Sequence, residues 1–138
     1  MHSCLVDIAT LKASPVKGII LSGGPSSVYD ADAPHLQQAI WDWAAAEGIP
    51  VLGICYGFQE MASKLGGHVA KAPEREFGHA EVRRVPVPAG APYDAALLEG
   101  LPDKFSVWMS HGDKIHAIPP GFGNIAVSGG QLAIHTSG

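Results

Sequence analysis

The chain has 138 residues, 46% of them hydrophobic, which fits one domain with a real core and is too short for two ordinary domains. Its formal net charge is −4 and its nine Lys and Arg residues are scattered, so neither nucleic acid nor an anionic membrane is expected as a partner. This charge distribution makes small polar metabolites the expected partners. No apolar stretch approaches the roughly 20 residues that cross a bilayer, and no export signal is visible.

The first half of the chain alternates predicted strands and helices. Gly18–Leu21 is a short β-branched run before a Ser-Gly-Gly-Pro loop, which is typical of a buried parallel strand. Ala33–Glu47 has apolar residues at helical spacing, with Pro34 at an early helical position. A second strand, Pro50–Cys55, and a second helix, Phe58–Leu65, follow. The alternation predicts an α/β fold with a mostly parallel twisted sheet and flanking helices.

The second half of the chain predicts a small antiparallel β portion. His79–Val87 and Lys104–Met109 have the pattern of strands, and frequent prolines confine any helix to a short stretch near Tyr93–Leu98. Ile125–Val127 and Gln131–Ile134 surround a Gly-Gly pair and predict a closing hairpin.

The cysteine content excludes a disulfide framework. The two cysteines, Cys4 and Cys55, form no C-x-x-C pattern, so no metal site is expected and a reducing, cytoplasmic compartment is predicted.

Cys55 lies at a predicted strand-to-helix corner between Gly53 and Gly57. This is the spacing of the G-x-S-x-G turn that lifts a nucleophile above a parallel sheet. A helix N-terminus stabilises a thiolate and offers free N–H groups to an oxyanion, and the loop at Gly23 and Gly24 is placed to supply a second donor. The alternative is a structural cysteine buried in the core, because free cysteine is among the most buried residue types.

Four segments carry a resemblance to a known family. They are "GICYGFQ" (Gly53–Gln59), "KGIILSGGPSSVYD" (Lys17–Asp30), "EREFGHAEV" (Glu74–Val82) and "VWMSHGDKI" (Val107–Ile115). Together they resemble the class I glutamine amidotransferases, and within these the glutaminase domains of the GMP-synthetase type. The resemblance implies a flavodoxin-like α/β fold and release of ammonia from glutamine through a cysteine thioester.

The resemblance also implies a role for individual residues. Cys55 would be the nucleophile, and the N–H groups of Gly24 and Tyr56 would form the oxyanion hole. Gln59 would contact bound glutamine, with a solvated helix residue as the alternative. A loop would hold the amino-acid end of the substrate, and its residues are Ser110, His111, Gly112 and Asp113. The domain itself would need no cofactor, because ATP and Mg²⁺ would belong to an absent ATP-pyrophosphatase (synthetase) domain or subunit, which is the implied protein partner.

The chain departs from the family pattern near both ends. The family's base and its orienting carboxylate lie in a Phe-His-Pro-Glu stretch, which is absent from these 138 residues. Among the seven histidines, His135 and His111 are the alternatives for a base. The strand and helix that carry an Asp-Phe-Gly-Ser-Gln-like signature in relatives are also missing, so the expectation is an incomplete glutaminase domain. The second hypothesis is therefore a remnant that binds glutamine or a partner without turnover.

Two other functions, nucleotide binding and a different cysteine hydrolase activity, fit the sequence less well. The segment "SGGPSS" (Ser22–Ser27) resembles a pyrophosphate-binding loop, but Ser26 stands where the aspartate belongs, so nucleotide binding is not expected. A DJ-1-like or PfpI-like hydrolase would also place a cysteine at an elbow, but it would have no need of Gln59 or of the segment from Ser110 to Asp113.

Overall fold

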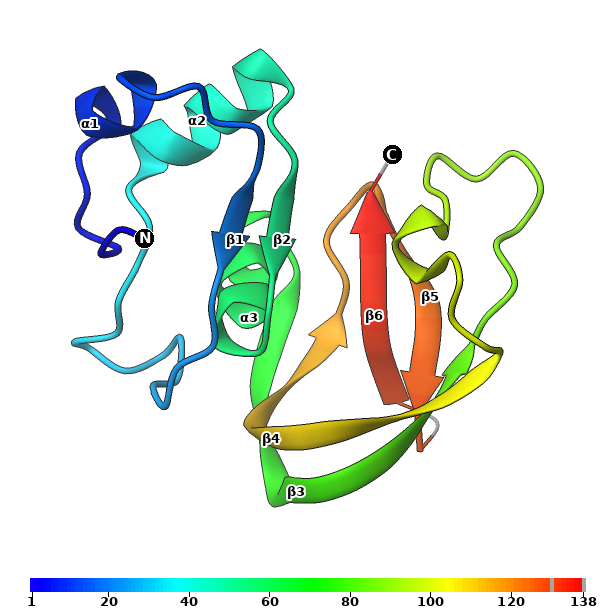
Figure 1. Ribbon diagram of the computed structural model, residues 1–138. Coiled ribbons are helices and arrows are strands. Elements are labelled where there is room, and N and C mark those ends of the chain that lie inside the picture. Colours follow the sequence, from blue (N-terminus) through cyan, green and yellow to red (C-terminus); the bar gives the residue numbers. More distant parts are fainter. Residues whose placement is uncertain (130, 138) are drawn as a thin grey trace. The chain divides into compact units, whose positions relative to one another are not determined.

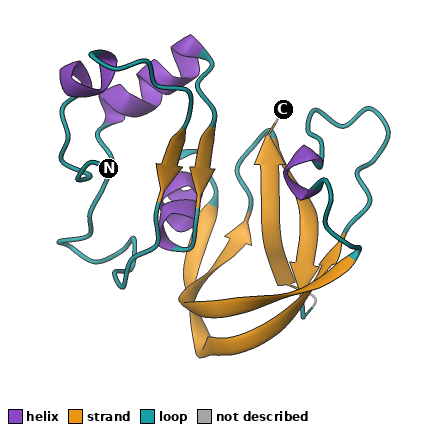
Figure 2. Cartoon of the chain, in the orientation of Figure 1, coloured by secondary structure: helices purple, strands orange, loops and turns teal. Residues whose placement is uncertain are grey.

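The computed structural model describes residues 1–129 and 131–137, and the side chains of residues 72–77, 110–112 and 131–137 lie outside this description. The chain forms two compact units, Met1–Met61 and Ala62–Gly138, which are described separately. Long strands dominate the second unit (Figure 2). In the described part of the chain, no helix is both long enough and apolar enough to cross a membrane.

The first unit contains a parallel strand pair and its helices (Figure 1). Its strands pair in register, with Ile19 opposite Val51 and Leu21 opposite Gly53. The helix after the second strand begins in this unit. In chain order the elements are α1 (Ile8–Lys12), β1 (Ile19–Leu21), α2 (Gln38–Glu47), β2 (Val51–Gly53) and α3 (Tyr56–Lys64).

Helix α1 is a short element that the sequence patterns did not predict. Asp7 caps it: its carboxylate accepts hydrogen bonds from the Thr10 amide at 2.9 Å and from the Thr10 hydroxyl at 2.8 Å. These bonds stabilise the charged form of Asp7 and lower the pKa of its carboxyl group. An Asp followed three residues later by Thr is thus the local signal that fixes this helix start.

Helix α2 begins at Gln38, so the prediction that the helix starts around Ala33 and Pro34 is wrong. The preceding residues are held by α3 instead: the Tyr56 hydroxyl donates to the Pro34 carbonyl at 2.8 Å, and the Leu36 amide donates to Glu60 at 3.2 Å. These tertiary bonds use backbone groups in the segment that the helix was predicted to contain. The predicted helix end is confirmed, because Gly48 forms the C-cap with a φ of 63°.

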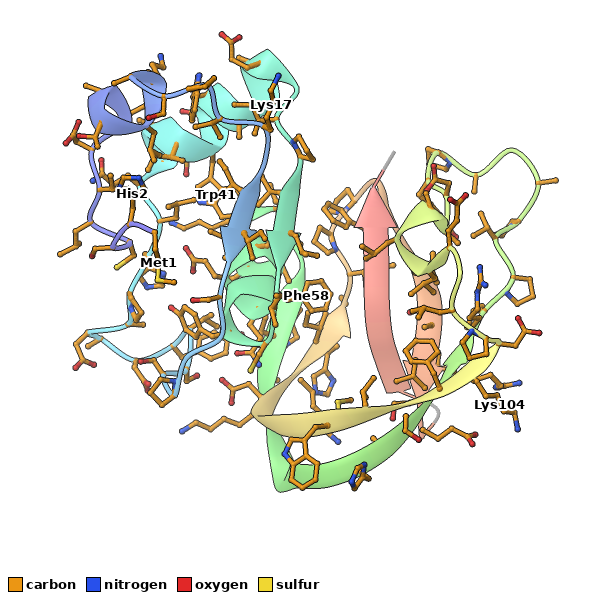
Figure 3. All side chains as sticks on the ribbon, in the orientation of Figure 1. Met1, His2, Lys17, Trp41, Phe58 and Lys104 are labelled. Carbon is orange, nitrogen blue, oxygen red and sulfur yellow. The ribbon has the colours of Figure 1, made fainter. Side chains whose placement is uncertain are left out.

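The core of the first unit lies against α2. Ile40, Trp41 and Ala44 are the buried residues of this helix, and Trp41 is labelled in Figure 3. The helical spacing of apolar residues in the sequence includes Ile40, Trp43 and Ala44. Ile40 and Ala44 are buried as this spacing predicts, whereas Trp43 is only half-buried and Trp41 is buried instead.

The second unit is an antiparallel sheet with the strand order β4-β3-β5-β6. Its core cluster consists of Val82, Leu98, Ile125 and Ala126. The α/β class is confirmed, but in the described residues the parallel part has two strands and the antiparallel part, with four, is the larger. The elements are β3 (His68–Arg84), the 3₁₀ helix η1 (Ala96–Leu98), β4 (Lys104–Ala117), β5 (Phe122–Ser128) and β6 (Gln131–Ser137).

Strands β3 and β4 are much longer than predicted, and the reason is their mutual pairing. They pair from His68 opposite Ala117 to Arg83 opposite Lys104. A register shift between Lys71 and Glu76 absorbs Pro73, which cannot donate a ladder hydrogen bond. The closing hairpin of β5 and β6 is confirmed, although Gly130 in its predicted turn lies outside the described residues.

Candidate active site

Cys55 lies where β2 ends and α3 begins, as the spacing of its flanking glycines predicted. Its side chain is exposed. Its φ is 52°, and it is the only non-glycine with a positive φ in the described part of the chain. A left-handed conformation costs an ordinary residue about 1–2 kcal/mol. Such strain at an exposed cysteine is typical of a nucleophile elbow.

The two glycines of the elbow are required because neighbouring backbone leaves no space for a side chain. A β-carbon at Gly57 would collide with the carbonyl group of Leu21 in β1. A β-carbon at Gly53 would lie 2.6 Å from the Phe58 Cα and 2.7 Å from the Gly57 oxygen. Helix α3 therefore begins in direct contact with the strand pair, and the G-x-C-x-G pattern reflects this close approach.

The loop after β1 lies against the elbow. A β-carbon at Gly23 would lie 3.3 Å from Cys55 Cβ and 3.9 Å from its Sγ. A β-carbon at Gly24 would lie 3.9 Å from Tyr56 Cβ. The structure thus brings together Cys55, Gly24 and Tyr56, three residues that the resemblance assigned to the reaction.

The amides that follow Tyr56 in α3 donate to backbone carbonyl groups of the elbow. The amides of Phe58 and Gln59 donate to the Cys55 carbonyl at 3.0 and 3.1 Å, and the Gly57 amide donates to Ile54 at 3.0 Å. The Tyr56 amide precedes these and is the first amide of the helix. An exposed sulfur beside a helix N-terminus is suited to attack a carbonyl carbon while backbone amides bind the resulting oxyanion.

A polar layer beneath the elbow was missed by the sequence analysis. Glu60 is only 3% exposed, and its carboxylate lies 2.8 Å from His35 Nδ1 and 3.2 Å from the Leu36 amide. Its partners satisfy a buried charge that would otherwise be costly. Tyr56 and Glu60 are four residues apart and so share one face of α3. This four-residue spacing was the feature of the sequence that could have identified Glu60 as a second residue of α3 that binds the segment before α2.

Burial, and secondarily the negative charge of Glu60, raises the pKa of Tyr56 to about 12. Both causes disfavour the phenolate. At neutral pH the Tyr56 hydroxyl is therefore protonated and donates a hydrogen bond to the Pro34 carbonyl.

The prediction of a loop over Ser110–Asp113 is wrong. The backbone continues through β4 there, with His111 opposite Glu76 and Asp113 opposite Lys71. The irregularity lies on the partner strand, which places four residues opposite Gly112 alone. The side chains of Ser110 and His111 lie outside the described residues.

Gln59 is buried, with 7% of its surface exposed, so the alternative of a solvated helix residue is wrong. It lies in α3, in the same unit as Cys55, whereas Ser110–Asp113 belong to the second unit. His135, an alternative base, lies in β6 opposite Asn124, and its side chain is outside the described residues.

Comparisons with known proteins all find glutamine amidotransferases or GMP synthases. The family model for glutamine amidotransferase class-I matches residues 2–136. The GMP synthase (glutamine-hydrolyzing) of Thermomicrobium roseum is 52% identical over 122 residues, covering 88% of this chain and 21% of that protein. The same enzyme of Methylobacillus flagellatus is 46% identical over 134 residues, covering 91% and 23%. A crystal structure of a glutamine amido transferase from Methylobacillus flagellatus matches with a TM-score of 0.71 and 28% identity, covering 88% of this chain and 47% of that one.

The chain therefore belongs to the class I glutamine amidotransferases, as the four resembling segments predicted. It spans about a fifth of the length of these curated relatives.

The elbow geometry predicts that Gly57→Ala destabilises the protein. The added methyl group has to displace the backbone of β1 or of α3, and overpacking of this kind costs about 1–3 kcal/mol. Gly18→Ala is the matched control, because its β-carbon would meet Pro50 at an ordinary 3.5 Å. Urea unfolding measures both. Equal stability of the two variants would show that α3 does not press on β1 as described.

The buried Tyr56 hydroxyl predicts a specific loss of stability at high pH. The folded state holds the proton up to a pKa of about 12, whereas an unfolded tyrosine loses it near pH 10. This contribution to stability is complete below pH 10 and is lost as the pH rises towards 12. Tyr56→Phe should therefore lose less stability than the wild type over that interval. The exposed Tyr29 provides the control, and if Tyr29→Phe behaves like Tyr56→Phe, the assignment to Tyr56 fails.

Proposed function

We propose that this chain is a glutaminase domain of the GMP-synthetase type. It would hydrolyse glutamine to glutamate and ammonia through a thioester on Cys55, and the ammonia would aminate XMP in GMP synthesis. The observation that carries this proposal is the left-handed, exposed Cys55 with Gly23 packed against it and Gly24 packed against the neighbouring Tyr56. The similarity to GMP synthases supports the choice of pathway.

In the proposed reaction the Cys55 thiolate attacks the carboxamide carbon of glutamine. The amides of Gly24 and Tyr56 donate hydrogen bonds to the oxyanion, which stabilises the transition state more than the substrate. Collapse of the intermediate breaks the C–N bond as the departing nitrogen takes up the proton that left the Cys55 thiol, so that ammonia is released and a glutamyl thioester remains. Water then attacks the thioester, releasing glutamate and returning a proton to the sulfur.

Substrate binding would use fixed polar groups, since glutamine carries an ammonium, a carboxylate and a carboxamide. Gln59 would contact the substrate from α3. Ser110, His111, Gly112 and Asp113 would bind its amino-acid end from β4. An apolar slot alone would not satisfy these groups.

The proposal also covers the cofactors, the protein partner and the cellular location of this domain. Thioester chemistry at Cys55 needs no cofactor or metal in this domain. ATP and Mg²⁺ would serve a synthetase domain or subunit, which is the proposed partner and the destination of the ammonia. The sequence has two cysteines and no C-x-x-C pattern, which supports the proposal of a reducing, cytoplasmic location.

A second candidate is that these 138 residues by themselves bind glutamine or a synthetase partner without turnover. It is favoured by one observation, the lack of a Phe-His-Pro-Glu stretch in these 138 residues. Both candidates place glutamine at Cys55 and Gln59. They differ only in whether a base is present to transfer the protons that turnover requires.

Labelling with a glutamine-analogue diazoketone tests the proposed nucleophile. The reagent should modify Cys55 stoichiometrically, and excess glutamine should slow the reaction, because recognition at the site brings the electrophile to the sulfur. Mass spectrometry locates the adduct. Cys4→Ala should label like the wild type, and Cys55→Ala should not label at all. Equal labelling of both thiols, without protection by glutamine, would contradict the proposal.

Turnover by the 138-residue chain alone is expected to be slow. A Cys-His-carboxylate unit without its base loses proton transfer in both half-reactions, a loss on the order of 10³-fold or more in analogous triads. Ammonia release should therefore be far below that of an intact GMP synthase, with or without an added synthetase domain. Rapid turnover that Cys55→Ala abolishes would show that a base is present, and His111→Ala and His135→Ala would then identify it.

A further inference from the structure

Two histidines lie next to each other at one end of the β3–β4 ribbon, in the second unit. The ring centroids of His68 and His116 are 6.1 Å apart and their planes meet at 61°. Both residues are exposed. The glutaminase reaction proposed above assigns no role to either residue.

A β-bulge brings the two rings to the same place. His68 pairs with Ala117, whereas the next residue, Val69, pairs with Ile115. His116 is therefore the extra residue on β4. Bulges turn a side chain away from the direction that regular alternation would give it, and this one places the His116 ring beside His68.

The backbone that carries this pair is tightly fixed. A β-carbon at Gly67 would lie 2.7 Å from the Ala117 carbonyl oxygen, and the Gly67 amide donates to Ala62 at 2.8 Å. Val69 is only 1% exposed and Pro119 is also buried. Both histidines thus extend from a rigid support, which reduces the entropy lost when a ligand holds the two rings together.

We propose that His68 and His116 form a binding site for a divalent transition-metal ion, with Zn²⁺ as its representative. Imidazole nitrogen suits Zn²⁺, Ni²⁺ and Cu²⁺, whereas Mg²⁺ and Ca²⁺ prefer oxygen. With Zn–N bonds near 2.0–2.1 Å, two imidazoles on one zinc ion hold their centroids about 5–6 Å apart. The observed separation of 6.1 Å lies at the upper end of that range.

The protein supplies two ligands to this site. Within the described residues, no group of three or more His, Cys, Asp or Glu side chains is placed to hold a metal ion. Water or a solute completes the coordination, so the affinity is below that of a four-ligand structural site. Bound metal links the first residue of β3 to the end of β4, and because only the folded state holds the rings together, binding stabilises the fold by mass action.

Zinc titration of the full chain tests this site. Because thiolates also bind zinc, the measurements use a Cys4→Ser, Cys55→Ser background. Calorimetry should find one Zn²⁺ per chain, and Zn²⁺ should raise the Tm, whereas Mg²⁺ should leave it unchanged. His68→Ala and His116→Ala should each weaken binding at least tenfold and remove the rise in Tm.

His79→Ala is the matched control, since His79 is exposed on β3 but packs against Trp108 with a centroid distance of 4.8 Å. It should bind zinc like the background protein. The proposal is overturned if the background protein binds no zinc, if both variants keep their affinity, or if His79→Ala loses as much. The variants His68→Gln and His116→Gln keep a polar side chain. If they lose as much zinc affinity as the alanine variants while their circular dichroism is unchanged, misfolding is excluded as the cause.

Discussion

The close approach of α3 to the backbone of β1 is the constraint on which the site depends. Gly57 meets the Leu21 carbonyl group and Gly53 meets Phe58, with no space for a β-carbon at either glycine. A helix that starts this near the strand pair leaves a very short connection. The second of the two residues in that connection, Cys55, therefore adopts a left-handed φ and presents its side chain to solvent. The strain at Cys55 is offset by the packing of the helix on the strands.

The polar layer under α3 supports the same arrangement. Glu60 and Tyr56 bind the segment before α2, through the Leu36 amide, the His35 ring and the Pro34 carbonyl. These bonds satisfy buried polar groups and hold the first two turns of α3 against the segment before α2. The first turn of α3 is thereby held from two sides, which keeps the Tyr56 amide in a constant position beside the sulfur.

Much of the elbow could be predicted from the sequence, because its glycine spacing directly reflects local crowding of the backbone. Cys55 at the end of β2, the Gly23–Gly24 loop beside it and the C-cap at Gly48 were all predicted correctly. The pattern succeeds here because only glycine fits where backbones come this close, so the sequence records the contact even though Gly57 and Leu21 are far apart in the chain.

The errors occur where distant residues decide the local structure. The late start of α2 depends on hydrogen bonds to α3, about 25 residues away. The segment from Ser110 to Asp113 is strand because β3 pairs with it across more than 30 residues of sequence. The partners of a buried carboxylate such as Glu60 are equally invisible to periodicity, since one of them, the Leu36 amide, belongs to the backbone.

A crystal structure of the chain after reaction with a glutamine-analogue diazoketone is the sharpest test of the oxyanion hole proposed at the elbow. We expect a covalent bond from the analogue to Cys55 Sγ, with the ketone oxygen accepting hydrogen bonds from the Gly24 and Tyr56 amides at about 2.7–3.1 Å. An adduct on Cys55 whose oxygen points to solvent, away from both amides, would contradict this proposal.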